Sequence, residues 1–82
     1  MFTEKDVEKI VVKKTNAEKI IYEMLQYMSQ KNIQEFYDRY ISVDVVIIND
    51  IQFTENFSAL KEEFEKFIKY LLENGKRVVL DT

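Results

Sequence analysis

The sequence predicts an α/β fold built on a three-stranded parallel sheet. The first observation is the run Val45 to Ile48, in which consecutive β-branched apolar residues leave neither face of a strand polar. Such a run is typical of a strand that is buried on both sides, as the central strands of parallel sheets are. The second observation is the alternation of strand, two helices, strand, helix and strand along the chain, which indicates β-α-β crossovers.

Length and composition place the chain among small soluble domains. Its 82 residues are expected to form one domain, residues 1–82. A domain of this size buries only ~60–65% of its unfolded surface, so its stability margin is small. The hydrophobic content of 46% and the charged content of 33% are those of a globular protein and not of a disordered one.

Residue types that the sequence lacks exclude several kinds of chemistry. The 82 residues include no cysteine and no histidine, so they supply no thiolate nucleophile, no zinc ligand set and no histidine acid–base catalyst. We predict no cofactor. The net charge of −3 argues against general binding to nucleic acid or to an anionic membrane. No apolar run approaches the ~18–20 residues that span a bilayer. Because residues 1–6 also lack a signal-peptide core, we expect a cytoplasmic protein without membrane contact.

The first elements follow from apolar segments and helix start signals. Residues 2–8 are interpreted as a lead-in or one helical turn, and residues 9–14 as a short strand. The stretch from Thr15 to Glu18 matches a capping box, in which Thr15 caps the helix and Glu18 reaches back. Apolar residues then recur at helical spacing and predict an amphipathic helix to about Ser29.

A second, shorter helix is predicted to begin after Asn32. Its apolar face carries Phe36, Tyr37 and Tyr40. Aromatic side chains of this kind can stack on nucleic-acid bases. Packing of these aromatics against the first helix is the favoured interpretation.

Beyond the central strand, residues 54–58 are predicted to turn into a long helix. Its expected buried stripe comprises Phe57, Leu60, Phe64, Phe67, Ile68, Leu71 and Leu72. Asn74 and Gly75 end this helix, because glycine adopts the left-handed conformation of a helix cap at low cost. Residues 77–80 form the last predicted strand.

Two polar residues, Asn49 and Asp50, follow the central strand directly. Ligands of open α/β sheets bind at this carboxyl edge. A hydrophobic strand that ends in two acidic residues is the Walker B pattern, in which the first acid holds Mg²⁺ and the second helps to position the attacking water. Asn49 puts an amide in place of the first acid, and a sequence with one glycine contains no glycine-rich phosphate loop. Asn49 and Asp50 are therefore interpreted as a degenerate Walker B site.

Several further passages carry a resemblance to a known family. They are Ala17-Glu18-Lys19, Glu35-Phe36, Arg39-Tyr40, Ser42-Val43-Asp44, Asn49-Asp50-Ile51-Gln52-Phe53, Glu62-Glu63-Phe64 and Gly75-Lys76. With these passages, the chain from about Ile10 to Thr82 resembles the middle of the AAA+ ATPase domain of DnaA, the bacterial replication initiator. Ile51-Gln52-Phe53 after the Walker B pair is the passage most specific to DnaA and its close relatives.

The resemblance implies an AAA+, P-loop-like fragment that is not an enzyme. In the family, the Walker A loop would precede Ile10 and sensor 1 would be completed beyond Thr82, so we expect a truncated, non-catalytic remnant. The two helices between the first two strands correspond to an insertion that faces single-stranded DNA in the family. Lys19 and Arg39 are the matching basic positions, whereas Ile41 stands where the family usually has lysine or arginine.

The resemblance also implies the strand order 1-2-3. Right-handed crossovers that step in one direction then place the helices mainly on one face of the sheet. An open second face and an unpaired edge at residues 78–80 would form an interaction surface. We expect Val46, Ile48 and Val79 to contribute to it, and the partner to be a second copy in a homodimer or an AAA+ replication protein.

The leading functional hypothesis is therefore a non-catalytic interaction or regulatory protein in DNA replication initiation. A single-stranded DNA binder that uses Lys19 and Arg39 is one alternative. The others are an ATPase subunit completed in trans by another chain and an orphan domain without separate activity.

Overall fold

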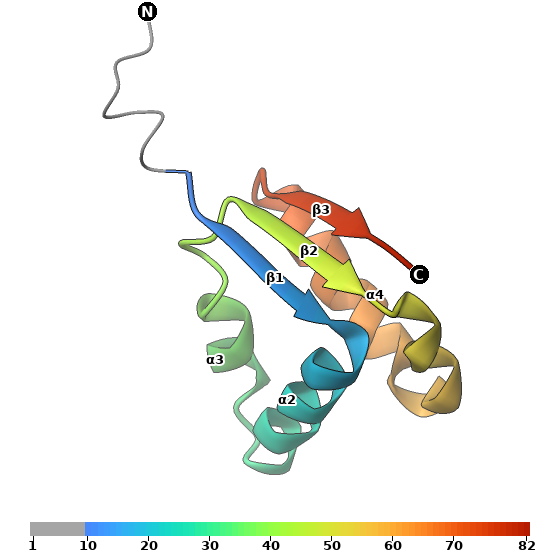
Figure 1. The fold of residues 1–82 in the computed structure, drawn as a ribbon. Helices are drawn as coiled ribbons and strands as arrows, with labels where there is room; N and C mark the ends of the chain where they lie inside the picture. The colour runs from blue at the N-terminus through green and yellow to red at the C-terminus, as the bar shows by residue number, and fades with distance from the viewer. Residues whose placement is uncertain (1–9) are drawn as a thin grey trace, which may run out of the picture.

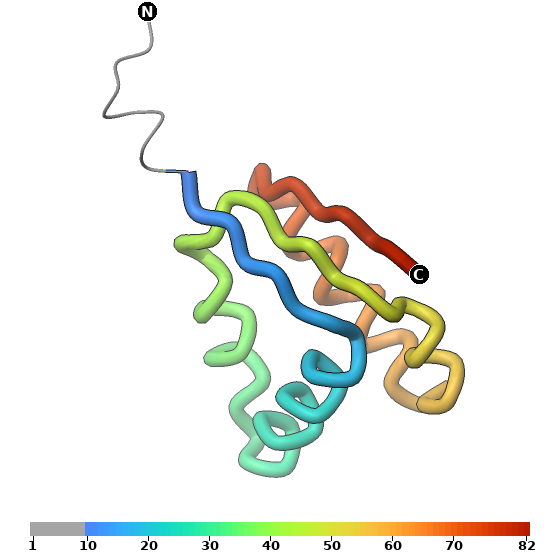
Figure 2. The backbone as a smooth tube through the Cα atoms, viewed as in Figure 1, coloured from blue at the N-terminus to red at the C-terminus, as the bar shows by residue number. Residues whose placement is uncertain are grey.

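The computed structural model describes residues 10–82, so the lead-in predicted at residues 2–8 lies outside the described residues. Figure 2 follows the chain through these residues. The elements in chain order are β1 (Val12–Asn16), α2 (Ala17–Ser29), α3 (Ile33–Asp38), β2 (Val45–Asn49), the 3₁₀ helix η1 (Ile51–Asn56), α4 (Ser58–Glu73) and β3 (Arg77–Leu80). The predicted succession of strands and helices is confirmed, and the segment expected to be a turn at 54–58 is mostly the 3₁₀ helix.

The three strands form one parallel sheet in the order β1-β2-β3. Helices α2, α3 and α4 all lie behind this sheet, while its other face carries no helix in the part of the chain that the structure describes (Figure 1). The predicted strand order and the placement of helices on one face are thereby confirmed. Both crossovers step in the same direction, which for right-handed connections requires this one-sided arrangement.

The register assigns each strand residue to a face. Cross-strand neighbours point to the same side of a sheet, and one row consists of Lys14, Ile47 and Val79. The next row contains Val46, whose side chain is fully buried against the helices. Alternate residues therefore line a helix-covered face and an open face.

The core lies between the helix-covered face and the three helices. Its fully buried members include Val46 and Ile48 of the central strand. The ring of Phe36 in α3 lies 4.9 Å from that of Phe67 in α4 and 5.8 Å from that of Tyr27 in α2, measured between centroids. The predicted packing of these aromatics against the first helix is confirmed for Phe36, which also packs against α4.

The first strand begins and ends later than the sequence predicted. It runs to Asn16 and not to residue 14, and Thr15 is buried within it. The side chain of Asn16 caps α2 by accepting a hydrogen bond of 2.8 Å from the backbone N–H of Lys19. The prediction that Thr15 is the cap is wrong, because Thr15 lies on the helix-covered side of the strand and only the next residue is free to turn back.

Helix α4 confirms most of its predicted stripe. Leu60, Phe64, Phe67 and Leu71 are buried, but Leu72 is 56% exposed. The prediction for Leu72 is wrong because each residue advances by about 100° around a helix, and the sheet covers one side of α4 only. Gly75 follows the helix with a φ of +75°, as expected for a left-handed cap.

Candidate functional site

The carboxyl ends of the three strands meet at one edge of the sheet. Asn49 ends β2 and pairs in register with Asn16, which ends β1. Asp81 follows β3, and its N–H donates to the carbonyl of Ile48 at 2.9 Å. Asp81 also accepts a 3.1 Å hydrogen bond from the N–H of Ile51 at the start of η1. These two backbone hydrogen bonds place Asp81 next to the predicted Walker B residues Asn49 and Asp50.

Asp50 starts the 3₁₀ helix from a left-handed conformation, with φ +56° and ψ +43°. Aspartate is one of the few residues that visits this region readily. Its carbonyl accepts a hydrogen bond of 3.0 Å from the N–H of Phe53, and its side chain is exposed. Among residues 10–82, no three acidic, histidine or cysteine side chains lie close enough together to hold a metal ion. With a neutral amide at Asn49, this edge offers hydrogen-bonding groups more than metal ligands.

Lys19 lies in α2, one turn before Glu23, and Arg39 follows α3 and contacts α2. The Nη1 atom of Arg39 donates a 2.9 Å hydrogen bond to the hydroxyl of Tyr27 and lies 3.7 Å from the carboxylate of Glu23. The bond to Tyr27 is the main cause that raises the pKa of Arg39 above its ordinary value. Lys19 is exposed and lines a shallow hollow together with Glu23 and Tyr22. The structure therefore brings both basic residues close to the same acid, Glu23.

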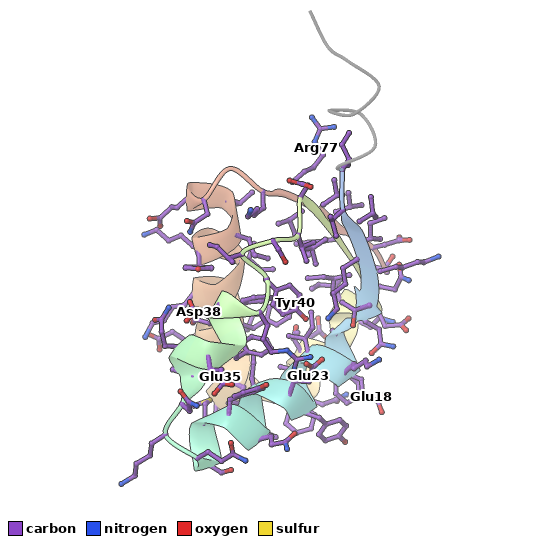
Figure 3. All side chains as sticks on the ribbon, turned by 90° about the vertical axis from the view of Figure 1, so that its left-hand side faces the viewer. Glu18, Glu23, Glu35, Asp38, Tyr40 and Arg77 are labelled. Atoms are coloured by element: carbon purple, nitrogen blue, oxygen red, sulfur yellow. The ribbon has the colours of Figure 1, made fainter. Side chains whose placement is uncertain are left out.

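Acidic side chains accompany these two basic residues. Glu18, Glu23, Glu35 and Asp38 lie on the side of α2 and α3 that Figure 3 presents to the viewer. Glu35 and Asp38 also take hydrogen bonds from Asn32 and Gln34, so their carboxylates are anchored there. A surface of mixed sign attracts the phosphates of nucleic acid weakly.

The interface residues predicted on the open face need a correction. Val46 and Ile48 are both 0% exposed, because their side chains point into the core beneath the helices. Val79 is 43% exposed and lies in the row of Lys14 and Ile47, on the open face. In a strand a shift of one residue exchanges the two faces. The open face is therefore lined by Ile47 and its neighbours, in place of Val46 and Ile48.

Sequence reasoning missed the structural role of Asp44. Its Oδ2 atom accepts a hydrogen bond of 2.7 Å from the N–H of Val11, and its carbonyl accepts one of 2.9 Å from the N–H of Arg77. Asp44 thus connects the amino ends of all three strands. The available signal was a lone carboxylate placed directly before an apolar run.

A small apolar pocket lies beside the outer edge of β3. Its volume is about 260 Å³, and its lining includes Ile51, Phe64, Ile68 and Leu80. Leu80 is 49% exposed, so the pocket is continuous with the free edge of the last strand. Separately, none of the helices in residues 10–82 has the length and apolarity needed to cross a membrane.

Comparison with known proteins places the chain in a family. Residues 2–82 match the family model described as the bacterial DnaA ATPase domain. The chromosomal replication initiator protein DnaA of Pelobacter propionicus is 34% identical over 65 residues, which cover 79% of this chain and 14% of the relative. The DnaA of Sulfurimonas denitrificans is 31% identical over 70 residues, which cover 85% of this chain and 16% of the relative. The chain thus spans a small part of the length of these relatives.

Solved structures agree in fold. Domain III of the Thermotoga maritima initiator DnaA superimposes with a TM-score of 0.81 at 23% identity, over 95% of this chain and 33% of that chain. AMPPCP-bound DnaA from Aquifex aeolicus gives a TM-score of 0.77 at 24% identity, over 93% of this chain and 24% of that chain. By the family match, this chain belongs to the bacterial DnaA ATPase domain family, and its fold corresponds to part of such an AAA+ domain.

Proposed function

We propose that the 82-residue chain is a non-catalytic interaction protein in replication initiation, which acts by association and not by nucleotide turnover. The observation that carries this proposal is the amide of Asn49, which stands at the carboxyl end of β2 where the Walker B pattern has an acid. Hydrolysis requires a phosphate cradle, a metal site and a positioned water together. Of these three, the described residues supply at most the carboxylate of Asp50 for the water.

The open side of the sheet supports association as the mode of action. Val12 is 56% exposed and Val79 is 43% exposed, on either side of the central strand. Exposed apolar patches and unpaired edge strands favour contact with another protein. The partners that fit are a second copy of this chain or a full-length DnaA-type initiator.

Binding of single-stranded DNA is the competing proposal, and the shared location of Lys19 and Arg39 favours it. A solved relative is described as bound to AMPPCP and single-stranded DNA. Against it stand the ion pair that already occupies Arg39 and the acidic residues around it. Phosphate contacts depend on unpaired basic side chains, so this proposal ranks second.

The first test is ATP turnover by the purified chain with Mg²⁺. We expect no turnover above the protein-free rate, either by the wild type or by Asn49→Asp, because a restored carboxylate alone does not build a phosphate cradle. Circular dichroism verifies that both proteins are folded. Turnover that rises in Asn49→Asp alone would refute the proposal. Turnover that rises only when a DnaA-type chain is added would also refute it, and would establish an ATPase completed in trans.

The second test is binding. Sedimentation of the chain alone and with the full-length initiator of the same organism measures association, and we expect a complex in at least one case. A chain that is monomeric and ignores the initiator would contradict an interaction role. Fluorescence anisotropy with a single-stranded oligonucleotide decides the competing proposal, since salt-dependent binding that is lost in Arg39→Ala would favour DNA.

A further inference from the structure

We infer that a second copy of this chain pairs with the outer edge of β3. The two β3 strands run antiparallel about a two-fold axis at Val79, and the two sheets join into one continuous sheet. This inference rests on the proposed function, for which it names a partner and a surface. Four observations carry it: the free edge, the direction of its backbone groups, its charges and the pocket beside it.

The outer edge of β3 is free and apolar. Within residues 10–82, β3 pairs with β2 alone. Three of its four residues, Val78, Val79 and Leu80, are apolar. The opposite edge strand, β1, instead carries Lys13 and Lys14 at its centre. Because lysines protect an edge strand against pairing, β3 is the edge that accepts another strand.

The direction of the backbone groups in β3 selects the residues that pair. The N–H groups of Arg77 and Asp81 donate to β2, to the carbonyls of Asp44 and Ile48, each at 2.9 Å. Backbone groups of successive strand residues alternate in direction, so those of Val78 and Leu80 point away from β2. The N–H of the preceding residue, Lys76, is already bonded to the carbonyl of Leu71. Val78 and Leu80 therefore offer the free donors and acceptors of this edge.

A two-fold axis at Val79 satisfies these groups. It places Val78 of each copy opposite Leu80 of the other copy, which gives two such pairs. In each pair the two residues donate to and accept from each other, as in an antiparallel ladder. The two Val79 residues face each other without hydrogen bonds. This register also keeps the helices of both copies on the same side, because directly opposed residues share a face.

Charge complementarity distinguishes this register from the others. With the axis at Val79, Arg77 of each copy lies opposite Asp81 of the other. Both residues are exposed, and in residues 10–82 neither has an ion-pair partner. A parallel pairing in the same register would set Arg77 beside Arg77, which is destabilising. Moving the axis to Val78 would set Arg77 opposite the apolar Val79.

The pocket beside β3 completes the surface. Leu80 lines it with Ile68 and Phe64, and a neighbouring strand on this edge would cover its open side. Leu72 lies one turn beyond Ile68 on α4 and is 56% exposed. Ile68 and Leu72 thus continue the apolar strip from the strand onto the helix, where the second copy lies.

Charge reversal tests the pairing. Sedimentation equilibrium of the full 82-residue chain over a concentration series gives the dimer Kd. We expect Arg77→Glu and Asp81→Lys each to raise this Kd by about tenfold or more, since each creates two like-charge contacts across the axis. The double variant Arg77→Glu/Asp81→Lys restores opposite charges and should return the Kd to within about threefold of wild type. Lys14→Glu on the other edge strand, with the same charge change as Arg77→Glu, is the matched control and should have little effect.

The alternative outcomes are distinct. A wild type that stays monomeric throughout the series overturns the inference, and so does a double variant that remains as weak as the single ones. A dimer that Lys14→Glu weakens, but Arg77→Glu does not, places the interface at β1 or on the open face and also overturns it. None of these results bears on ATP turnover or on binding to a full-length initiator, and these two measurements test the proposed function separately.

Discussion

At the scale of single residues, Tyr40 shows how burial alters a side chain that the sequence presents as ordinary packing. The residue is 1% exposed, and its hydroxyl has no hydrogen-bond partner among residues 10–82. Burial, and to a smaller extent the charge of Glu23, raises the pKa of Tyr40 to about 12. The Nζ atom of Lys13 lies 4.7 Å from the centre of the ring. Because the hydroxyl is buried without a partner, the neutral side chain suits this site better than a phenolate, even with the Lys13 ammonium over the ring.

Replacing Tyr40 by phenylalanine tests this description. In the wild type the folded pKa of about 12 exceeds the ordinary 10.0, so Tyr40 stabilises the fold below pH 10 and this contribution is lost as pH rises to 12. The loss is on the order of 2 kcal/mol. Urea unfolding between pH 9 and 12 should show a shallower decline for Tyr40→Phe, with no loss of stability at pH 7. The exposed Tyr22→Phe is the control, and equal alkaline slopes in all three proteins would contradict the assignment.

At the scale of elements, the junction between β1 and α2 shows where local sequence stops being decisive. Thr15 and Asn16 are both good capping residues. The choice between them depends on the sheet, because Thr15 points to the helix-covered face and Asn16 does not. No local pattern contains that information.

The cap at Asn16 should be measurable as stability. Asn16→Ala removes the acceptor for the N–H of Lys19 and should lower the free energy of unfolding by about 1 kcal/mol. Asn16→Asp keeps an acceptor and should retain most of the stability. Urea titration with circular dichroism gives both values. If Asn16→Ala were as stable as wild type, the hydrogen bond seen in the structure would contribute nothing.

The same comparison explains what the sequence predicted well and what it did not. Val45 to Ile48 predicted the central strand correctly, because a run without polar residues is typical of a strand with neighbours on both edges. The expectation of burial on both sides is wrong within residues 10–82, since Val45 and Ile47 are only partly buried on the open face. The run could not tell which of Val46 and Ile47 faces the helices, since both are equally apolar. Leu72 was misplaced for a similar reason, because helical spacing marks an apolar side without showing how wide the sheet is. The resemblance to DnaA predicted the strand order, which no local pattern in this sequence determines.

At the scale of the whole molecule, the fold is a single layer of helices on a single sheet. The fully buried side chains lie between these two layers, and the second face of the sheet is open within the described residues (Figure 1). A chain of this size has a small stability margin. A partner that binds the open edge or face of the folded chain, and not the unfolded chain, therefore raises the free energy of unfolding by an amount that grows with its concentration.

This coupling predicts a melting temperature that depends on protein concentration. If β3 pairs with β3 of a second copy, dilution shifts the equilibrium to monomers that lack the stabilisation of the joined sheet. Each tenfold rise in concentration above the dimer Kd should raise Tm by about 3–5 °C. Arg77→Glu should show a weaker dependence in the same concentration range, and the double variant Arg77→Glu/Asp81→Lys should regain it. Differential scanning calorimetry across two decades of concentration measures the shift. A Tm that stays constant in the wild type would mean that the small core supports the fold alone and that the β3 edge contributes no stabilising contact.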